Sequence, residues 1–158
     1  MADDAATIHA SAVLTGARAV LIRGPSGAGK SRLALDLIEA VQSGALRFAR
    51  LVGDDRVHVQ AAGGRLLARP AETLAGLIEV RGLGILRLPY EPSAVVGLVV
   101  DLGANVGRLP KDTERQVDIE GVSLPRLAVA AGSEALPAVL TLLTCGATAF
   151  CQPEFATL

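Results

Sequence analysis

The stretch Gly24-Pro25-Ser26-Gly27-Ala28-Gly29-Lys30-Ser31 matches the Walker A pattern Gly-x-x-x-x-Gly-Lys-Ser in full. Glycines in this pattern allow positive φ angles and let the backbone approach a phosphate group with no Cβ atom in the way. Consecutive N–H groups form an anion-binding nest, and the following helix points the positive end of its dipole at the same anion. We expect Lys30 to reach the β- and γ-phosphates of a nucleoside triphosphate and the Ser31 hydroxyl to bind Mg²⁺. The motif predicts nucleotide binding, but it does not identify the acceptor of a phosphoryl group.

The sequence on both sides of this motif has the periodicity that a P-loop requires. The short apolar run Ala19–Ile22 precedes the motif and predicts a buried strand. After the motif, Leu33 and Leu37 are four residues apart, which predicts an amphipathic helix. This helix begins at Lys30, and Gly44 is its expected stop. A strand, a glycine-rich turn and a helix in this order support the P-loop interpretation over a chance glycine-rich turn.

Short apolar runs separated by turn residues predict further strands. The strongest run predicts a central strand, and Gly63-Gly64 between two runs predicts a hairpin. A short helical or turn segment is expected after Pro70 and a last helix over Ala135–Leu143. The predicted extended segments are Thr7–Leu14, Leu51-Val52, Val57–Gln60, Arg65–Ala68, Ile78–Val80, Ile85–Leu88, Ala94–Leu102 (the central strand), Val117–Ile119 and Val122–Val129.

These elements place the chain in the α/β class. We expect a P-loop kinase-like sheet flanked by helices, with additional β segments, in a single catalytic domain that spans residues 1–158. Aromatic residues make up only 3% of the chain, and a core of Val, Leu, Ile and Ala favours a largely parallel sheet packed by helices.

Composition and charge exclude several classes of protein. Hydrophobic residues make up 51% and charged residues 20%, which is typical of a globular domain. The net charge of −1 provides no basic field for a nucleic-acid partner. The acidic start Met1-Ala2-Asp3-Asp4 has neither the cationic residues nor the apolar run of a signal peptide. We therefore expect a cytoplasmic protein that binds neither nucleic acid nor a membrane.

The C-terminal part of the chain tests this expectation. No charged residue lies between Glu134 and Glu154, but a proline and several polar residues interrupt the stretch and no cationic flank follows. We interpret it as a buried helix that breaks near Gly146, followed by an apolar tail suited to a subunit contact. Cys145 and Cys151 match no metal or redox motif, and we expect both to be buried thiols.

Two groups of acidic residues compete for the role of the functional carboxylate. Asp101 ends the apolar run Val95–Val100, which is the generic Walker B pattern of a buried strand followed by an acid. Asp54 and Asp55 follow the shorter run Leu51-Val52. Two adjacent carboxylates in a partly desolvated site repel each other, so that one of them can exchange a proton with a serine hydroxyl as a general base. A solvated turn is the alternative interpretation of the pair.

Glu79-Val80-Arg81-Gly82-Leu83-Gly84-Ile85 is the other dense cluster. In a strand Glu79 and Arg81 point to the same face, where a carboxylate and a guanidinium group can hold metal and phosphate together. An exposed ion pair beside a glycine turn is the alternative. His58 is interpreted as an ordinary strand residue, and His9 by itself would be interpreted in the same way.

Taken together, these motifs resemble the catalytic domain of the HPr kinase/phosphorylase family, in order from Ile8 to Leu143. The matching segments are Ile8-His9-Ala10 (an extended segment with a functional histidine), Gly24–Ser31 (the P-loop), Leu51–Asp55 (a strand that ends in an acidic pair), Glu79–Ile85 (the family's signature sequence) and Arg108-Leu109-Pro110 (an arginine-containing loop). The signature and the acidic pair, at this spacing after a P-loop, are specific for the family.

The resemblance implies a kinase that uses ATP and Mg²⁺ to phosphorylate a serine of HPr, a small phosphocarrier protein of the sugar phosphotransferase system. It also implies the reverse phosphorolysis, in which inorganic phosphate held in the same cradle attacks phosphoserine and releases pyrophosphate. It further implies a homo-oligomer, a hexamer in the family, in which HPr docks across neighbouring subunits. The chain looks like a short form that lacks the family's N-terminal domain, and a nitrogen-branch relative of HPr is its expected partner.

The resemblance also implies roles for individual residues. Asp54 is expected to be the base in the kinase direction and the acid in the reverse direction, tuned or positioned by His9 and Asp55. Arg108 is expected to contact phosphate or the protein substrate, and Ser31 and Glu79 to bind the metal. The expected phosphate-binding residues are Gly24, Pro25, Ser26, Gly27, Ala28, Gly29, Lys30, Ser31 and Arg81.

Two other functions remain open from the residues alone. One is a small-metabolite or nucleotide kinase that uses Asp101 as its Walker B acid. Such enzymes usually carry an arginine-rich lid, for which only Arg108–Arg115 is a candidate. The other is a nucleotide-gated interaction module that binds ATP and a partner protein with little turnover.

Overall fold

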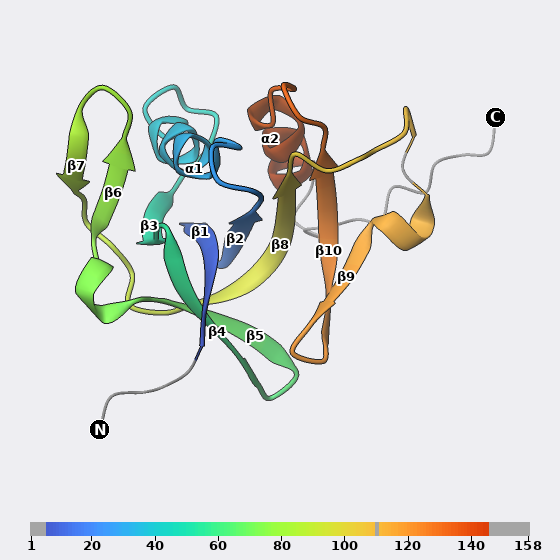
Figure 1. The fold of residues 1–158 in the computed structure, drawn as a ribbon, viewed down its shortest axis with the longest axis horizontal. Helices are drawn as coiled ribbons and strands as arrows, with labels where there is room; N and C mark the ends of the chain where they lie inside the picture. Colours follow the sequence, from blue (N-terminus) through green and yellow to red (C-terminus); the bar gives the residue numbers. More distant parts are fainter. Residues whose placement is uncertain (1–5, 110, 146–158) are drawn as a thin grey trace.

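A mixed sheet with two helices over one side forms the centre of the molecule (Figure 1). The computed structural model describes residues 6–109 and 111–145. In chain order the elements are β1 (Thr7–Thr15), β2 (Arg18–Arg23), α1 (Lys30–Glu39), β3 (Ala49–Gly53), β4 (Arg56–Ala62), β5 (Arg65–Pro70), the 3-10 turn η1 (Glu72–Leu74), β6 (Leu77–Val80), β7 (Gly84–Arg87), β8 (Ala94–Leu102), the 3-10 turn η2 (Asp112–Glu114), β9 (Gln116–Ile119), β10 (Val122–Val129) and α2 (Leu136–Thr144).

The prediction of an α/β fold is confirmed, but the prediction of a largely parallel sheet is wrong. Strand β8 pairs in parallel with β2 and β10, and the other pairings among the described strands are antiparallel. Tight hairpin turns join β1 to β2, β4 to β5, β6 to β7 and β9 to β10, and a tight turn forces antiparallel pairing. As predicted, β8 is a central strand.

Five of the strands pair in a closed cycle. The order is β2, β1, β4, β5 and β8, and the β2–β8 pairing returns the cycle to its start. All five strands contribute to one buried cluster, which also includes Val52 of β3 and Leu124 of β10. Because a ring of five strands encloses little space, small side chains suit its interior. The alanines in this cluster are Ala10, Ala12, Ala19, Ala68 and Ala94.

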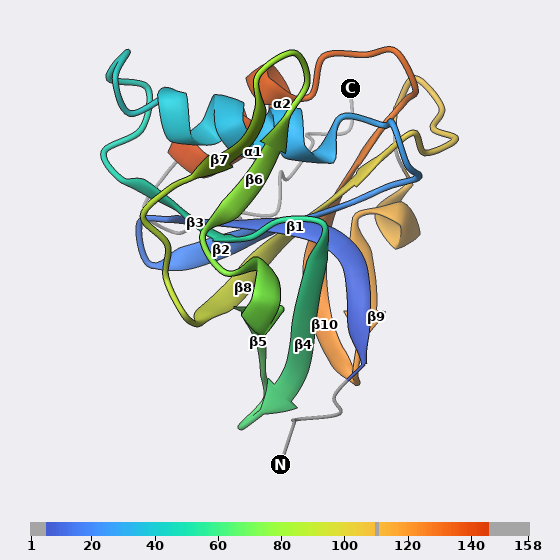
Figure 2. The same cartoon turned by 60° about the vertical axis from the view of Figure 1, so that its left-hand side comes forward.

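A second core cluster lies between the sheet and the helices. Alternate residues of β2 separate the two cores: Leu21 belongs to the cluster of the ring, whereas Ile22 packs with the helices. Leu33 and Leu37 of α1 and Val139 of α2 are buried in this second cluster. Figures 1 and 2 show both helices over the same side of the sheet, and the β4–β5 and β9–β10 hairpins extending away from them.

The predicted elements are all present, with differences at their ends. Helix α1 ends at Glu39, and Gly44 lies in the turn that follows, with a φ of 80°. Helix α2 is only partly buried, with Val139 as its buried residue, so the prediction of a buried helix is wrong in this respect. Cys145 is a free and exposed thiol, which contradicts its predicted burial.

Some predictions concern residues outside the described part of the chain. These are Cys151, Pro110 of the arginine-containing loop and the apolar tail after Cys145. Within residues 6–109 and 111–145, no helix has the length and apolar character needed to cross a membrane.

Candidate active site

The Gly24–Ser31 segment forms a tight loop between β2 and the first turn of α1. Gly24, Gly27 and Gly29 have φ angles of 155°, 81° and 97°, which L-amino acids with side chains rarely adopt. A Cβ atom on Gly24 would lie 2.8 Å from the carbonyl oxygen of Leu102 at the end of β8. The glycines of the motif therefore meet the conformational requirement that the sequence predicted for them.

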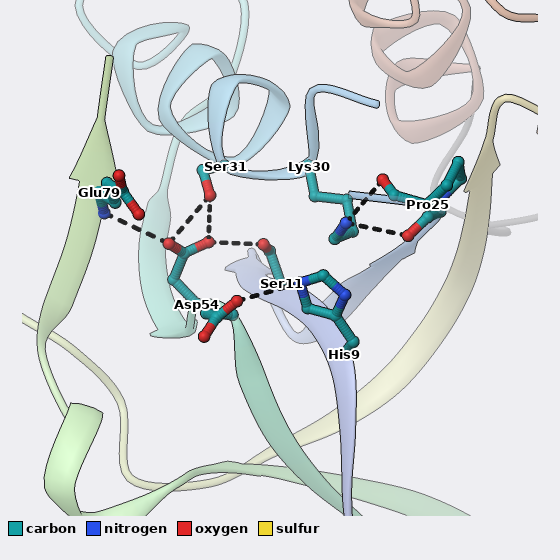
Figure 3. A network of polar contacts seen from close by, with 9 residues as sticks. His9, Ser11, Pro25, Lys30, Ser31, Asp54 and Glu79 are labelled. Carbon is teal, nitrogen blue, oxygen red and sulfur yellow. Dashed lines mark hydrogen bonds and ion pairs between the residues drawn. The ribbon is translucent and has the colours of Figure 1, made fainter. Parts of the chain in front are cut away.

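Lys30 is held against its own loop. Its Nζ donates hydrogen bonds to the carbonyl oxygens of Gly24, at 2.9 Å, and Pro25, at 3.0 Å (Figure 3). The residue is only 6% exposed. Its ammonium group therefore lies at the phosphate cradle, but it must exchange these carbonyl acceptors for phosphate oxygens to perform the predicted role.

The Asp54 carboxylate lies directly beneath the start of α1. Ser31 Oγ donates to it at 2.8 Å from Oδ1 and 2.9 Å from Oδ2, and Ser11 Oγ donates to Oδ1 at 2.6 Å. The backbone N–H of Glu79 approaches Oδ2 at 3.3 Å. Figure 3 shows the four residues converging from α1, β1, β6 and the β3–β4 turn. Asp54 is 4% exposed, which contradicts the alternative of a solvated turn for this residue.

A left-handed turn separates the two adjacent acids. Asp55 has a φ of 69°, a conformation that Asp tolerates better than most residues. Its carboxylate lies 3.0 Å from His9 Nε2, and its side chain is 61% exposed. The pair therefore does not act as two carboxylates in one environment: Asp54 is buried against serines, and Asp55 faces a histidine at the surface.

A cavity of about 460 Å³ lies over these groups. It brings together residues from the P-loop, β1, the acidic turn and the β6–β7 hairpin, which are far apart in the sequence. Arg108, which is exposed on the segment after β8, is not among its lining residues, and neither is the buried Asp54, which contacts the lining residue Ser31. Gly24, Pro25 and Ala28 of the P-loop are also not among the lining residues. The candidate residues that line the cavity are His9, Ser26, Gly27, Gly29, Lys30, Ser31, Asp55, Glu79 and Arg81.

Asp101 is engaged by two arginines. Its carboxylate accepts hydrogen bonds from Arg23 Nε at 2.8 Å, Arg23 Nη2 at 2.9 Å and Arg126 Nε at 2.5 Å. Burial alone would raise the pKa of Asp101, but the hydrogen bonds and charges of Arg23 and Arg126 outweigh burial and hold the pKa below its ordinary value. The two arginines thus already neutralise the negative charge of the Asp101 carboxylate, and this weakens the interpretation of Asp101 as a Walker B acid.

The oxygen-rich donor set beside the P-loop fits Mg²⁺. This ion prefers oxygen ligands and is usually bound by one or two carboxylates together with substrate phosphates. The Ser31 hydroxyl binds the Asp54 carboxylate, and Ser31 and the exposed Glu79 line the same cavity. No group of three His, Cys, Asp or Glu residues suited to a metal occurs in the described ranges.

Ser11 is the site residue that the sequence interpretation missed. It is fully buried, and its hydroxyl makes the shortest contact to Asp54. Residues two apart in a strand point to the same face, so Ser11 follows His9 toward the site. That alternation was the available signal, but a lone serine in an apolar strand does not reveal which group it will meet.

Comparisons with known proteins agree on one family. The family model described as HPr Serine kinase C-terminal domain matches residues 2–134. The HPr kinase/phosphorylase of Streptococcus thermophilus is 39% identical over 123 residues, which cover 70% of this chain and 37% of that protein. For the HPr kinase/phosphorylase of Streptococcus sanguinis the identity is 38% over the same lengths. This chain therefore spans only 37% of the length of these curated relatives.

A solved structure extends the comparison to the fold. The Hpr(Ser) kinase/phosphatase from Coxiella burnetii is similar with a TM-score of 0.70 and 25% sequence identity. The match covers 87% of this chain and 93% of that chain. The strands and helices that place the candidate site therefore follow an arrangement already seen in a solved protein.

Proposed function

The chain belongs to the family of HPr Serine kinase C-terminal domains, and we propose that it transfers the γ-phosphoryl group of ATP to a serine of an HPr-type phosphocarrier protein. We further propose that residues 1–158 act as a single P-loop kinase catalytic domain. The observation that carries the proposal is the contact between the Asp54 carboxylate and Ser31, which brings an acceptor for a proton to the end of a phosphate cradle.

In the forward direction, a serine hydroxyl of the substrate protein enters the cavity. Asp54 accepts its proton, the serine oxygen forms a bond to the γ-phosphorus, and the bond from that phosphorus to the bridging oxygen of ADP breaks. The backbone N–H groups of the loop and the ammonium group of Lys30 stabilise the charge on the phosphate oxygens. His9 contacts Asp55 and would orient it, and Arg81 of the β6–β7 hairpin lines the cavity, where its guanidinium group would bind phosphate oxygens.

Ser31 and Glu79, beside Asp54, would hold Mg²⁺ in this site. When bound, the ion neutralises charge on the β- and γ-phosphate oxygens. The Ser31 hydroxyl donates to Asp54 in this structure, so the same side chain links the proton acceptor to the place of the metal.

The same groups support the reverse reaction. Inorganic phosphate in the cradle attacks the phosphorus of phosphoserine, the bond to the serine oxygen breaks, and pyrophosphate forms. Asp54 then returns the proton to the serine oxygen. The names of the relatives, HPr kinase/phosphorylase and Hpr(Ser) kinase/phosphatase, motivate this part of the proposal.

Arg108 lies outside the cavity, and we assign it to contacts with the protein substrate. The proposal also includes a cytoplasmic location, since phosphocarrier proteins act there, and assembly into a homo-oligomer, a hexamer by family resemblance.

The test is incubation of the purified chain with γ-labelled ATP, Mg²⁺ and purified HPr-type proteins, followed by mapping of the labelled residue. We expect label on one serine of the carrier, and no label with Lys30→Ala, because that variant lacks the cation of the cradle. Transfer to a small metabolite, with no label on any carrier, would contradict the proposal and support a metabolite kinase. Nucleotide binding with no transfer to either acceptor would support an interaction module.

A further inference from the structure

The Asp101 carboxylate, near the carboxyl end of β8, connects β8 to β2 and β10 beside the start of the P-loop. Arg23 is the last residue of β2, and its guanidinium group forms a two-point contact with both carboxylate oxygens. Arg126 of β10 contacts Oδ2 from the other side. Asp101 is 13% exposed, and the two arginines are 31% and 23% exposed. A two-point contact of this kind fixes direction as well as distance.

The first half of the P-loop rests on the residues that follow Asp101. Gly24 is so close to Leu102 that even a Cβ atom would meet the Leu102 carbonyl oxygen at 2.8 Å. The next residues of the two segments are also neighbours, since a Cβ atom on Gly103 would lie 3.4 Å from the Pro25 ring. The end of β8 is thus the support on which the phosphate cradle is built.

The segment that carries Arg108 begins at this same support. The N–H of Ala104 donates to the carbonyl oxygen of Val129 at 3.0 Å, which ties its beginning to β10. At its end, Arg126 Nη1 donates to the carbonyl oxygen of Glu114 at 3.2 Å, and the Arg126 N–H donates to that of Arg115 at 2.7 Å. Arg126 therefore binds Asp101 and the far end of the segment at the same time.

We propose that Asp101 is a positioning residue that, through Arg126, fixes residues 103–109 and 111–115, and Arg108 with them, relative to the P-loop held by Arg23. The inference rests on the proposed function, which assigns Arg108 to the protein substrate. The pattern that marks Asp101 as a Walker B acid in the sequence thus has another use in this fold: the carboxylate joins the nucleotide-binding and substrate-binding parts of one site.

An ordinary stabilising ion pair is the competing explanation, and the chain offers a matched control. Arg50 Nη1 lies 2.9 Å from Glu91 Oε1, with side chains 42% and 29% exposed, and neither residue lines the candidate cavity. Glu91→Gln removes a similar pair with no connection to the Arg108 segment. It should therefore lower stability without changing the kinetics of phosphoryl transfer.

The experiment is a double-mutant cycle between Arg126→Lys and Arg108→Ala. Lysine at position 126 keeps the positive charge but cannot donate to Asp101 and Glu114 together. We expect Arg126→Lys to raise the KM for the carrier protein about tenfold, with kcat and ATP affinity changed by less than about threefold. In the Arg108→Ala background the same substitution should raise KM no further. Asp101→Asn should reproduce this pattern, and Glu91→Gln should not.

Hydrogen exchange gives a second measurement that does not depend on turnover. In Arg126→Lys and Asp101→Asn, the amides of 103–109 and 111–115 should exchange faster, whereas those of α1 should not. Additive KM effects in the cycle, or unchanged exchange in these segments, would overturn the positioning role. Absence of phosphoryl transfer by the wild-type chain would instead overturn the proposed function, so that the two failures are distinguishable.

Discussion

Asp54 is the residue on which the chemistry depends, because its carboxylate meets the P-loop serine and the strand that carries His9. Asp54→Asn keeps the shape of the side chain but removes the proton acceptor. We expect kcat to fall about 10²–10⁴-fold with ATP still bound. Initial rates with labelled ATP and calorimetric titration of the nucleotide test this prediction.

The control for this variant is Asp118→Asn, since Asp118 is exposed on β9, away from the cavity. Its rate should equal that of the wild type. Unchanged turnover in Asp54→Asn would remove Asp54 from the role of the base.

Ser11 supplies the buried hydroxyl that fixes one oxygen of Asp54. Ser11→Ala leaves that oxygen with one donor fewer on a residue that is only 4% exposed, and we expect a loss of about 1–3 kcal/mol in the free energy of unfolding. We also expect a lower kcat, because the Asp54 carboxylate is less well oriented without the Ser11 hydroxyl. Urea unfolding and initial rates measure the two effects, and Ser123→Ala, on exposed β10 surface, is the control.

At this scale the sequence predicted most of the residues that meet, apart from Ser11 and Arg108, but not how they are arranged. Motif residues from four segments do line one cavity. Lys30 contacts its own loop, and a left-handed turn separates Asp54 from Asp55. Both features depend on backbone angles that residue type alone does not determine. Arg108 lies apart from the cavity, because its segment follows the end of β8 toward β10.

At the scale of elements, the junction between the P-loop and β8 is the tightest contact of the site. Gly24→Ala combines a φ of 155° with an approach of 2.8 Å to backbone, whereas Gly27→Ala at a φ of 81° meets no atom within 4 Å. We expect losses of about 3 kcal/mol for Gly24→Ala and about 1–2 kcal/mol for Gly27→Ala. Equal losses in urea unfolding would show that the contact with Leu102 is not restrictive.

The ion pairs of Asp101 also act between elements, and they predict a pH dependence. The folded state lowers the pKa of Asp101, so the pairs stabilise the fold above the unfolded pKa of about 3.9 and lose this contribution as the pH falls through the folded value. Asp101→Asn should therefore cost about 1–3 kcal/mol near neutral pH and progressively less below about pH 4. Urea unfolding from pH 3 to pH 7 measures the difference, and a pH-independent difference would contradict the assignment.

Hairpins and the P-loop helix were predictable because their signals are local. Gly63-Gly64 lies between β4 and β5, and the leucine spacing after Lys30 corresponds to the buried side of α1. The direction of pairing was not predictable, because it depends on which distant strand becomes the neighbour of β8. Val99, for example, pairs with Leu21 on one side and Arg126 on the other.

At the scale of the whole molecule, the closed cycle of strands restricts the size of its interior side chains. Ala68 is fully buried in this cluster, whereas Ala61, on the same β4–β5 hairpin, is exposed. Ala68→Leu should lower the free energy of unfolding by about 1–3 kcal/mol, because the added atoms have no free volume. Ala61→Leu should change it by less than about 0.5 kcal/mol. A neutral Ala68→Leu in urea unfolding would mean that the ring is loosely packed.

The closed cycle also determines when the protein can acquire its fold during synthesis. Strand β2 pairs with β8, which ends at Leu102, so the cycle stays open until the residues up to Leu102 have left the ribosome. Until then, the unpaired edge of β2 is a template on which another extended chain can add. The nascent chain thus carries its phosphate-binding loop beside an exposed strand edge, and the arrival of β8 both covers that edge and supplies the support for the loop.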